Sequence, residues 1–398
     1  MIPTTEARQR ILAALAPVPT EWVGLAECAG RVLAEDVAAR TTQPPQDVSA
    51  MDGYALREAD VRFVPVTLTL AGEAPAGGQF AGTVQRGQCV RIFTGGPVPP
   101  GADTIVIQER VRAEGPRITI QQAPVAGMHI RKAGLDFRAG QVALNAGHTL
   151  TARDAGLAAA MNRPWLRVRR RPRVAIVSTG DELELPGDPL GPNQIVASNG
   201  FALSAFAAQW GALPVHLGIV RDRPEAFARL AGELSNVDLL VTSGGASVGD
   251  YDLVRSALGQ QGLTIDFWQI AMRPGKPLLF GRLGATPLLG LPGNPVSALV
   301  CAVLFLRPAI QRLLGASSAG EVPDVPALLG RDLPANDARE DFLRATLTRD
   351  EGGRWIATPF PIQDSSMLSL LARADCLVQR PAKAPAAKAG ETVRTIPL

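Results

Sequence analysis

The feature that most constrains the fold is an alternation of strand-like and helix-like segments that begins at Arg173. Helix-like segments follow Asn199, Asp222 and about Tyr251. Such alternation is typical of a mainly parallel, doubly wound sheet covered by helices. We therefore expect an α/β domain in which Asn199 and Asp222 cap two of the helices. The expected strands are residues 174–177, 213–220, 237–242, 265–270, 278–280 and 288–289.

The segments on either side of this domain have a different character. Short apolar runs separated by Gly and Pro predict β structure from residue 64 to about 150, and β character returns after Pro323. The prolines Pro44 and Pro45 mark a boundary. We expect an elongated, multidomain chain. Its parts are an N-terminal mixed helical domain formed by residues 1–40 and 135–170, an inserted β-rich domain (41–134), the α/β domain (171–320) and a C-terminal β domain (321–398).

Composition and charge exclude several classes of function. The 398 residues contain 46% hydrophobic residues, 40 Gly and 33 Pro, which predicts several buried cores rather than disorder. The 40 Lys and Arg against 37 Asp and Glu give a net charge of only +3, so nucleic acid is not an expected partner. Three histidines argue against a histidine-built metal centre and against a Ser/His/Asp triad.

Cysteine usage and hydropathy indicate a cytoplasmic protein with no membrane partner. The four cysteines lie far apart without a CxxC pair, which predicts neither a disulfide framework nor a zinc site. Residues 1–16 form an expected amphipathic helix rather than a signal peptide. Residues 283–306 carry no charge, but prolines and Asn294 divide them into a predicted buried strand and a buried helix.

Three loops that follow predicted strands carry residues suited to phosphate chemistry. They are residues 178–182 (STGDE), 242–252 (TSGGASVGDYD) and 290–295 (GLPGNP). Such loops meet at the carboxyl edge of an open parallel sheet, where Gly backbone N–H groups and Ser or Thr hydroxyls hold anions. Their carboxylates, with Asp222, are the oxygen ligands that Mg²⁺ takes beside phosphates. Spacing alone leaves open which of Asp181, Glu182, Asp222, Asp250 and Asp252 bind metal and which orient phosphate.

Two further loops carry charged residues that suit a substrate. In residues 272–277 (MRPGKP), Arg273 and Lys276 are held by prolines and a glycine, which favours binding of an oxyanion. Residues 49–55 (SAMDGYA) contain Asp52 followed by Gly53, which taken alone predicts an Asp-Gly turn.

Taken in order, six motifs resemble those of the MoeA family of molybdopterin molybdenumtransferases, to which the C-terminal part of gephyrin is related. They are SAMDGYA (49–55), FTGGPVP (93–99), STGDEL (178–183), SGGASVG (243–249), PGKP (274–277) and GLPGNP (290–295). The resemblance covers nearly the whole chain. It implies a transferase of molybdenum cofactor biosynthesis that inserts molybdenum from molybdate into adenylylated molybdopterin, with Mg²⁺-dependent release of AMP.

The resemblance also implies residue roles. Catalytic roles fall to Asp52, Glu182, Asp222, Asp252 and Lys276, with Glu182, Asp222 and Asp252 near the metal. Molybdate is expected against Arg273, Lys276, Arg344 and Ser365. Thr94, Arg131 and Asp136 match further substrate-binding positions. The adenylylated pterin is expected to contact Ser178, Thr179, Gly180, Asp181, Ser243, Gly244, Gly245, Ser247, Pro292, Gly293, Asn294 and Pro295.

The family's assembly implies an elongated homodimer in which the loop of Asp52 reaches the partner subunit's site. A MogA-like adenylyltransferase and molybdoenzyme apoproteins are further expected partners. Three departures from the family pattern stand near the expected site, one of which is Ala246, at a position where Val is more usual. Arg273 occupies a position where many relatives carry Lys, and Leu135 occupies one where Glu is frequent.

Two alternative functions remain at this stage. A MogA-like adenylyltransferase shares the Ser-Gly-Gly loop, although that family consists essentially of the sheet domain alone. A non-catalytic, gephyrin-like scaffold would use the same fold to bind peptides. Consumption of ATP would identify the first, and peptide binding without pterin chemistry the second.

Overall fold

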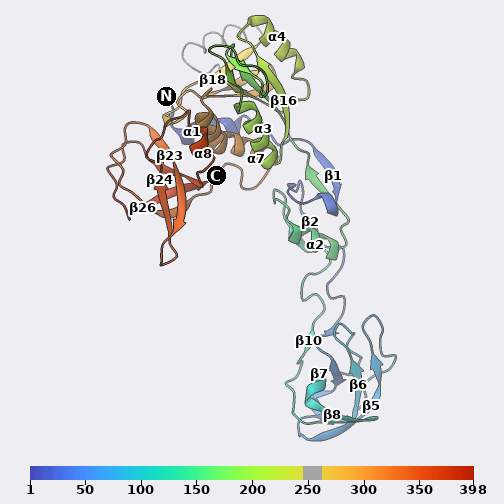
Figure 1. The fold of residues 1–398 in the computed structure, drawn as a ribbon. Helices are drawn as coiled ribbons and strands as arrows, with labels where there is room; N and C mark the ends of the chain where they lie inside the picture. The colour runs from blue at the N-terminus through green and yellow to red at the C-terminus, as the bar shows by residue number, and fades with distance from the viewer. Residues whose placement is uncertain (245–261) are drawn as a thin grey trace.

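The structure is a computed structural model that describes residues 1–244 and 262–398. Figure 1 shows an elongated molecule with a compact body at one end, a small middle domain and a distal β domain at the other end. The body contains the α/β domain and, beside it, the C-terminal β domain. The expected elongated, multidomain architecture is confirmed.

The α/β domain is built on a six-stranded sheet in the order β16-β13-β17-β21-β20-β18. The first four strands are mutually parallel, β20 is antiparallel to β21, and β18 is antiparallel to β20. The predicted doubly wound sheet is therefore confirmed, with a mixed edge. The bounds are β13 (Arg173–Thr179), β16 (Leu213–Val220), β17 (Leu239–Ser243), β18 (Leu263–Phe267), β20 (Leu279–Leu283) and β21 (Thr286–Leu291).

Alternate residues of the parallel strands face two separate cores. Val174 and Ile176 of β13 belong to one core with residues of α1 (Thr4–Ala13), α3 (Asn199–Gln209) and α6 (Pro295–Cys301). Ala175 and Val177 belong to the other, together with Leu230 of α4 (Pro224–Glu233). This follows from the two-residue period of a strand, and it means that helices pack against both faces of the sheet.

The two predicted helix caps are wrong. The N-cap of α3 is Ser198 and that of α4 is Arg223, and neither helix has a side-chain cap hydrogen bond. For Asn199 the physical reason is that its side chain is engaged by the strand-end loops. The side chain of Asn199 bonds to two of these loops, and the backbone N–H of Asp222 donates to Asp181 Oδ1 at 3.1 Å.

A long apolar helix crosses the core of the body. It consists of α6, a π-helical segment (Ala302–Leu306) and α7 (Arg307–Leu313). Among the described residues it alone is long and apolar enough to cross a membrane, but 83% of its most apolar window is buried inside the protein. The helix is therefore part of the core, and the predicted buried strand followed by a buried helix is confirmed by β21 and α6.

The C-terminal domain is a closed β barrel. Its strand β23 pairs with both β24 and β25, and β22 and β26 complete the ring. The short strand β19 (Met272–Arg273), from the α/β part of the chain, pairs with the start of β23 and joins the two domains. The bounds are β22 (Val325–Leu329), β23 (Glu340–Arg349), β24 (Trp355–Pro359), β25 (Cys376–Arg380), β26 (Thr392–Pro397) and α8 (Leu368–Leu371).

The middle domain is assembled from two separate stretches of chain. β1 (Thr20–Gly24) pairs with β12 (Trp165–Arg169), β2 (Val37–Ala38) pairs with β11 (Val142–Leu144), and α2 (Ala152–Ala160) covers them. The prediction grouped all of residues 1–40 with this domain. In the structure α1 packs instead in the α/β core, because its buried residues Ala7 and Ile11 contact that core.

The distal domain is a six-stranded sheet in the order β7-β4-β6-β5-β9-β8, with the short pair β3 and β10 where the chain enters and leaves. The entering and leaving segments are hydrogen-bonded to each other, from Gln43 N to Phe137 O at 2.9 Å and from Gly134 N to Pro44 O at 2.9 Å. The bounds are β3 (Val48–Ser49), β4 (Gly53–Leu56), β5 (Val66–Ala74), β6 (Gln88–Ile92), β7 (Thr104–Ile107), β8 (Val111–Glu114), β9 (Arg117–Ile120) and β10 (Ile130–Arg131).

Candidate active site

The carboxyl ends of β13, β17 and β21 meet at a cavity of about 700 Å³. This is the position at which open α/β sheets bind ligands, and the loops after the three strands line it as predicted. The loop after β16 adds Asp222, and Ser366 and Leu368 come from the C-terminal domain. The predicted residues that line the cavity are Ser178, Thr179, Gly180, Glu182, Asp222, Ser243, Gly244, Pro292, Gly293, Asn294 and Pro295.

The end of β13 brings two hydroxyl groups into the cavity wall without a partner. Ser178 is 2% exposed and Thr179 is 4% exposed, and neither Oγ of Ser178 nor Oγ1 of Thr179 has a hydrogen-bond partner among the described residues. Leaving a buried hydroxyl unbonded costs about 1–3 kcal/mol. A ligand that accepts hydrogen bonds from these hydroxyls would remove this cost.

Asn199 is a site residue that the sequence reasoning interpreted only as a cap. Its Nδ2 donates to Ser243 Oγ at 2.8 Å and to Gly293 O at 2.6 Å, and Ser243 Oγ donates to Pro292 O at 3.3 Å. Asn199 therefore links the loops after β17 and β21. Its place in the first turn of a helix that starts at this edge was the available sequence signal.

Arg221, which directly follows β16, holds the loop after β13 and was also missed. Its Nη1 donates to Asp181 O at 2.7 Å and to Leu183 O at 2.8 Å, and its Nη2 pairs with Glu184 Oε1 at 2.7 Å. The loop continues into β14 (Leu183–Glu184), which pairs with β15 (Ile195–Val196). Arg221 thus fixes the backbone on both sides of Glu182.

Two of the predicted metal ligands lie at the same cavity. Glu182 and Asp222 both line it, whereas the carboxylate of Asp181 accepts the backbone N–H of Asp222. Within residues 1–244 and 262–398, no three His, Cys, Asp or Glu side chains come together as a metal cluster. Four predicted residues, Gly245, Ser247, Asp250 and Asp252, lie outside the described residues.

The two cations of the loop at residues 272–277 differ in their surroundings. Arg273 Nε donates to Asp341 Oδ1 at 2.9 Å, and its Nη1 lies 3.3 Å from Asp337 Oδ2. The hydrogen bond to Asp341 raises the pKa of Arg273, and the two carboxylates neutralise its charge. Lys276 is exposed and forms no ion pair with the described residues, while the next residue, Pro277, lines the cavity.

Arg344 and Ser365, predicted beside molybdate, shape a loop of the C-terminal domain. Arg344 is 2% exposed, and its Nη1 donates to Asp364 O at 2.6 Å and its Nε to Gln363 Oε1 at 3.1 Å. Burial lowers the pKa of Arg344. Ser365 Oγ accepts a hydrogen bond from Asn294 Nδ2 at 2.9 Å. Arg344 therefore holds the loop against the cavity rather than forming part of its wall.

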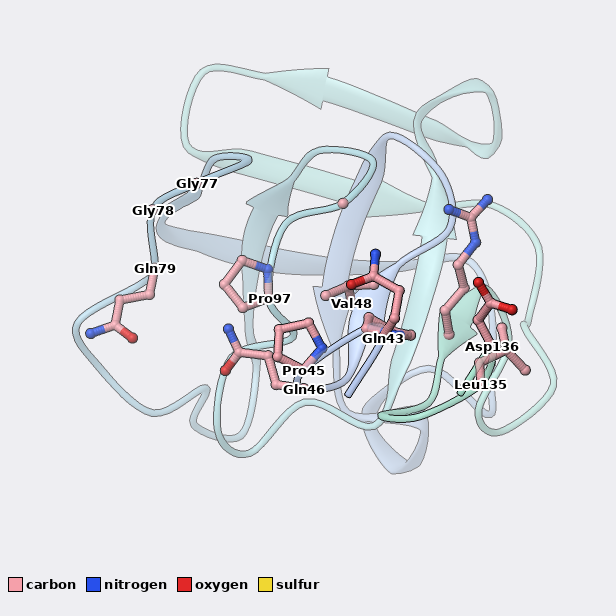
Figure 2. A pocket seen from close by; sticks show the side chains of 13 residues that line it. Gln43, Pro45, Gln46, Val48, Gly77, Gly78, Gln79, Pro97, Leu135 and Asp136 are labelled. Atoms are coloured by element: carbon pink, nitrogen blue, oxygen red, sulfur yellow. The ribbon is translucent and has the colours of Figure 1, made fainter. Parts of the chain in front are cut away.

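The remaining predicted residues lie in the distal domain and do not line this cavity. Asp52 Oδ1 accepts hydrogen bonds from Thr94 N at 2.7 Å and Thr94 Oγ1 at 2.8 Å, and these bonds lower the pKa of Asp52. Arg131 and Asp136 line a second cavity of about 670 Å³ in the same domain, which Figure 2 shows from close by. Within one chain, the two groups of predicted residues lie in separate parts of the elongated molecule (Figure 1).

Comparison with known protein families finds a match for three consecutive regions of the chain. Family models match residues 2–162 (MoeA N-terminal region, domain I and II), residues 175–312 (probable molybdopterin binding domain) and residues 326–398 (MoeA C-terminal region, domain IV). The three matches together account for most of the sequence.

Curated and solved relatives resemble the chain over most or all of its length. The molybdopterin molybdenumtransferase of Nostoc sp. is 41% identical over 341 residues, which cover 84% of this chain and 78% of that protein. The molybdopterin molybdenumtransferase of Haemophilus influenzae is 34% identical over 400 residues, which cover 100% of this chain and 98% of that protein. The crystal structure of a molybdopterin biosynthesis MoeA protein from Pyrococcus horikoshii matches with a TM-score of 0.86 at 27% identity, covering 100% of both chains.

Proposed function

The chain belongs to the MoeA family and is a transferase of molybdenum cofactor biosynthesis, and from this premise we propose its reaction and the roles of its residues. We propose that it inserts molybdenum from molybdate into adenylylated molybdopterin, with Mg²⁺-dependent release of AMP. The observation that carries the proposal is the pair of buried, unpartnered hydroxyls of Ser178 and Thr179 in a cavity that two carboxylates also line.

The three strand-end loops are suited to the phosphoanhydride of this substrate. The hydroxyl groups of Ser178 and Thr179 have no hydrogen-bond partner among the described residues and can act as donors. Gly180 and Gly244, which line the same cavity, allow phosphate oxygens to approach the backbone closely. Asn199 keeps two of these loops in register. Cleaving an anhydride requires preorganised donors and charge neutralisation rather than a nucleophilic side chain. The described lining of the cavity supplies the donors, and its carboxylates would hold the cation that neutralises the charge.

The carboxylates present fit a magnesium ion. Mg²⁺ usually keeps several waters and binds through one or two carboxylates together with substrate phosphates, which matches Glu182 and Asp222 at one cavity. We propose that these two residues hold it, with Asp252 as a further ligand. When bound, the ion would neutralise charge on the phosphates. Arg221 keeps the Glu182 loop in place, so that the carboxylate is positioned before the substrate arrives.

For molybdate we propose Lys276 as the principal cation. A divalent oxyanion requires positive charge that carboxylates have not already neutralised, and Lys276 has no carboxylate partner among the described residues. Arg273 is neutralised by Asp341 and Asp337 and would orient the loop that carries Lys276. Arg344 and Ser365 would act indirectly, by holding in place the loop whose Ser366 lines the cavity.

We further propose that two chains form an elongated homodimer with two composite sites. Asp52 and Thr94 lie in the distal domain and do not line the α/β cavity of their own chain, and a dimer would bring the distal domain of one subunit to the cavity of its partner. An adenylyltransferase would supply the substrate and molybdoenzyme apoproteins would receive the product. We place the reaction in the cytoplasm, where four free cysteines stay reduced.

The alternative of a MogA-like adenylyltransferase accounts only for the α/β part of the chain. The matched family regions at residues 2–162 and 326–398 favour the molybdenumtransferase. We find no observation that favours a scaffold function.

The test measures AMP release from adenylylated molybdopterin with Mg²⁺ while molybdate is varied, followed by assay of molybdenum bound to the pterin. Glu182→Ala should abolish turnover, and Lys276→Ala should raise the molybdate concentration needed. Glu27→Ala, which removes an exposed carboxylate in the middle domain, is the matched control. AMP release that does not depend on molybdate, or full activity of Glu182→Ala, would refute the proposal.

The composite site is tested by subunit mixing. Asp52→Ala and Glu182→Ala should each be inactive alone. After dissociation and random reassociation, half of the dimers carry one intact site of two, so about one quarter of wild-type activity should return. Failure to recover activity from mixed subunits that do form dimers would show that both residues act within one chain.

A further inference from the structure

The carboxylate of Asp52 is fixed through only one of its two oxygens. Oδ1 accepts hydrogen bonds from Thr94 N at 2.7 Å and from Thr94 Oγ1 at 2.8 Å. The backbone carbonyl of Asp52 accepts a further bond from Gln108 N at 3.2 Å. Oδ2 forms no hydrogen bond or ion pair with the described residues. Asp52 is therefore anchored to its own domain on one side, and its second carboxylate oxygen remains available.

One cationic side chain, that of Arg91, is held close to this loop by two aromatic rings. Arg91 belongs to β6 and stands opposite Tyr54 of β4, two residues after Asp52. Its guanidinium carbon lies 5.1 Å from the centroid of the Tyr54 ring and 5.0 Å from that of the Phe93 ring. Both distances fall within the roughly 6 Å at which a cation is attracted to an aromatic face. The rings therefore restrict Arg91, unlike an arginine that rotates freely at the surface.

The guanidinium of Arg91 bonds to the chain on both sides of the Asp52 anchor. Nη1 donates to Gly53 O at 3.3 Å, and Nη2 donates to Gln108 Oε1 at 2.6 Å. Gly53 directly follows Asp52, and Gln108 is the residue whose backbone N–H holds the Asp52 carbonyl. Gly53 is itself enclosed, because an added Cβ would lie 2.1 Å from Val106 O of the neighbouring strand β7. Arg91 thus links the Asp52 loop to a closely packed part of the sheet.

Arg91 also places a positive charge near the carboxylate of Asp52. Hydrogen bonds from Thr94 lower the pKa of Asp52 most, and the charge of Arg91 lowers it further. Arg91 forms no ion pair with the described residues, so no bonded carboxylate among them neutralises this charge. Asp52 is therefore held as an anion. An ionised carboxylate is an acceptor only, so its free oxygen can accept hydrogen bonds or approach a cation but cannot donate a proton.

We propose that Arg91 is a positioning residue for Asp52, which fixes the acidic loop so that the free oxygen Oδ2 is presented in a single orientation. This inference rests on the proposed function, because that function places Asp52 at the cavity of the partner subunit. Arg91 would act through Asp52 without touching substrate. A carboxylate that is ordered before the site fills loses little side-chain freedom when substrate arrives, and its geometry is ready for the reaction.

The first experiment compares AMP release by Arg91→Met and Arg91→Lys in the full chain. Met keeps contact with the two rings but removes the charge and both hydrogen bonds, so kcat should fall about 10- to 100-fold. KM for molybdate should change less than about twofold, because the proposed oxyanion site lies in the α/β domain. Lys keeps a cation over the rings but lacks the planar fork of donors, so its kcat should lie between the other two. The low-pH limb of kcat should move to higher pH in Arg91→Met, because loss of a nearby cation raises the pKa of Asp52.

Hydrogen exchange of single amides gives a second readout that does not require turnover. The Thr94 amide is bonded to Asp52 Oδ1 and should exchange at least about tenfold faster in Arg91→Met. The amides of β9, in the same domain, should keep their wild-type rates. Arg112→Met is the matched control, because Arg112 is an exposed arginine of the same domain whose partner is Glu114. It should change neither kcat nor the exchange of Thr94.

Several outcomes would overturn the inference. They are an unchanged kcat in Arg91→Met, a loss confined to KM, and an unchanged Thr94 amide. Equal acceleration of exchange throughout β4, β6 and β9 would show that Arg91 only packs the sheet, which also overturns it. If Arg91→Met does not fold, Gln108→Ala removes one of the two bonds at an exposed position and should speed Thr94 exchange about two- to tenfold, and no change there would count against the inference.

The two assays separate this inference from the proposed reaction. If the exchange of Thr94 depends on Arg91 but the wild-type chain releases no AMP, the positioning of Asp52 stands and the proposed reaction falls. If AMP is released and Arg91→Met changes neither kcat nor the exchange of Thr94, the reverse holds.

Discussion

The substitution Asn199→Asp tests whether one amide holds the strand-end loops together. The exchange keeps the shape of the side chain but replaces its N–H donors by carboxylate oxygens. The bonds to Ser243 Oγ at 2.8 Å and Gly293 O at 2.6 Å are donated by Asn199, so the second would become a contact between two acceptors. At about 0.5–1.5 kcal/mol for each bond, local opening of the loops should become easier by about 1–3 kcal/mol, or roughly 5- to 150-fold in equilibrium.

Amide hydrogen exchange is the suitable assay, because global unfolding of a multidomain chain does not give one free energy. Peptides covering residues 240–244 and 290–294 should lose protection in Asn199→Asp, while peptides of the C-terminal barrel should not. The catalytic efficiency of AMP release should fall by about tenfold or more, since misplaced loops no longer preorganise the donors. Asn145→Asp, at an exposed asparagine of the middle domain, should change neither quantity. Unchanged exchange at both loops in Asn199→Asp would refute the reasoning.

Two further predictions follow from the structure. Gly244 has φ +96°, and an added Cβ would lie 2.5 Å from Thr179 O, so Gly244→Ala should displace the loop. Substrate affinity, measured in a binding titration, should fall at least about tenfold. Amide hydrogen exchange of the distal domain should stay unchanged. Burial raises the pKa of Asp154, but hydrogen bonds from Thr151 and His148 lower it to about 2, below its ordinary 3.8. The resulting stabilisation of about 1–3 kcal/mol should be complete above about pH 4 and lost as the pH falls towards 2. Hydrogen exchange of α2 measured against pH checks this, and Asp154→Asn should be insensitive to pH in that window.

The features of the fold that the sequence predicted are those determined by local pattern. Strands β13, β16, β17 and β21 follow from apolar runs, and the loops that converge on the cavity follow from the rule that parallel strands end at one edge. The buried helix starting at Pro295 was predictable for the same reason, because proline and asparagine before an apolar run mark a helix start.

The features that sequence reasoning missed depend on partners far away in the chain. Arg273 was expected to be free for an oxyanion, but its partners Asp341 and Asp337 lie 68 and 64 positions away. Asn199 lies 44 positions from Ser243 and 94 from Gly293, and no local pattern distinguishes such an amide from a helix cap. The placement of α1 in the α/β core is likewise a consequence of packing between distant segments.

The paired segments that join the distal domain to the rest of the chain have a mechanical consequence. Gln43, Pro44 and Gly134 to Phe137 are tied across the gap by backbone hydrogen bonds, so the two strands form a single two-ply ribbon. A ribbon of this kind bends easily across its thin direction and resists bending within its own plane. Any swing of the distal domain is therefore confined to an arc, and Asp52 and Thr94, which are bonded to each other within that domain, travel along the arc together.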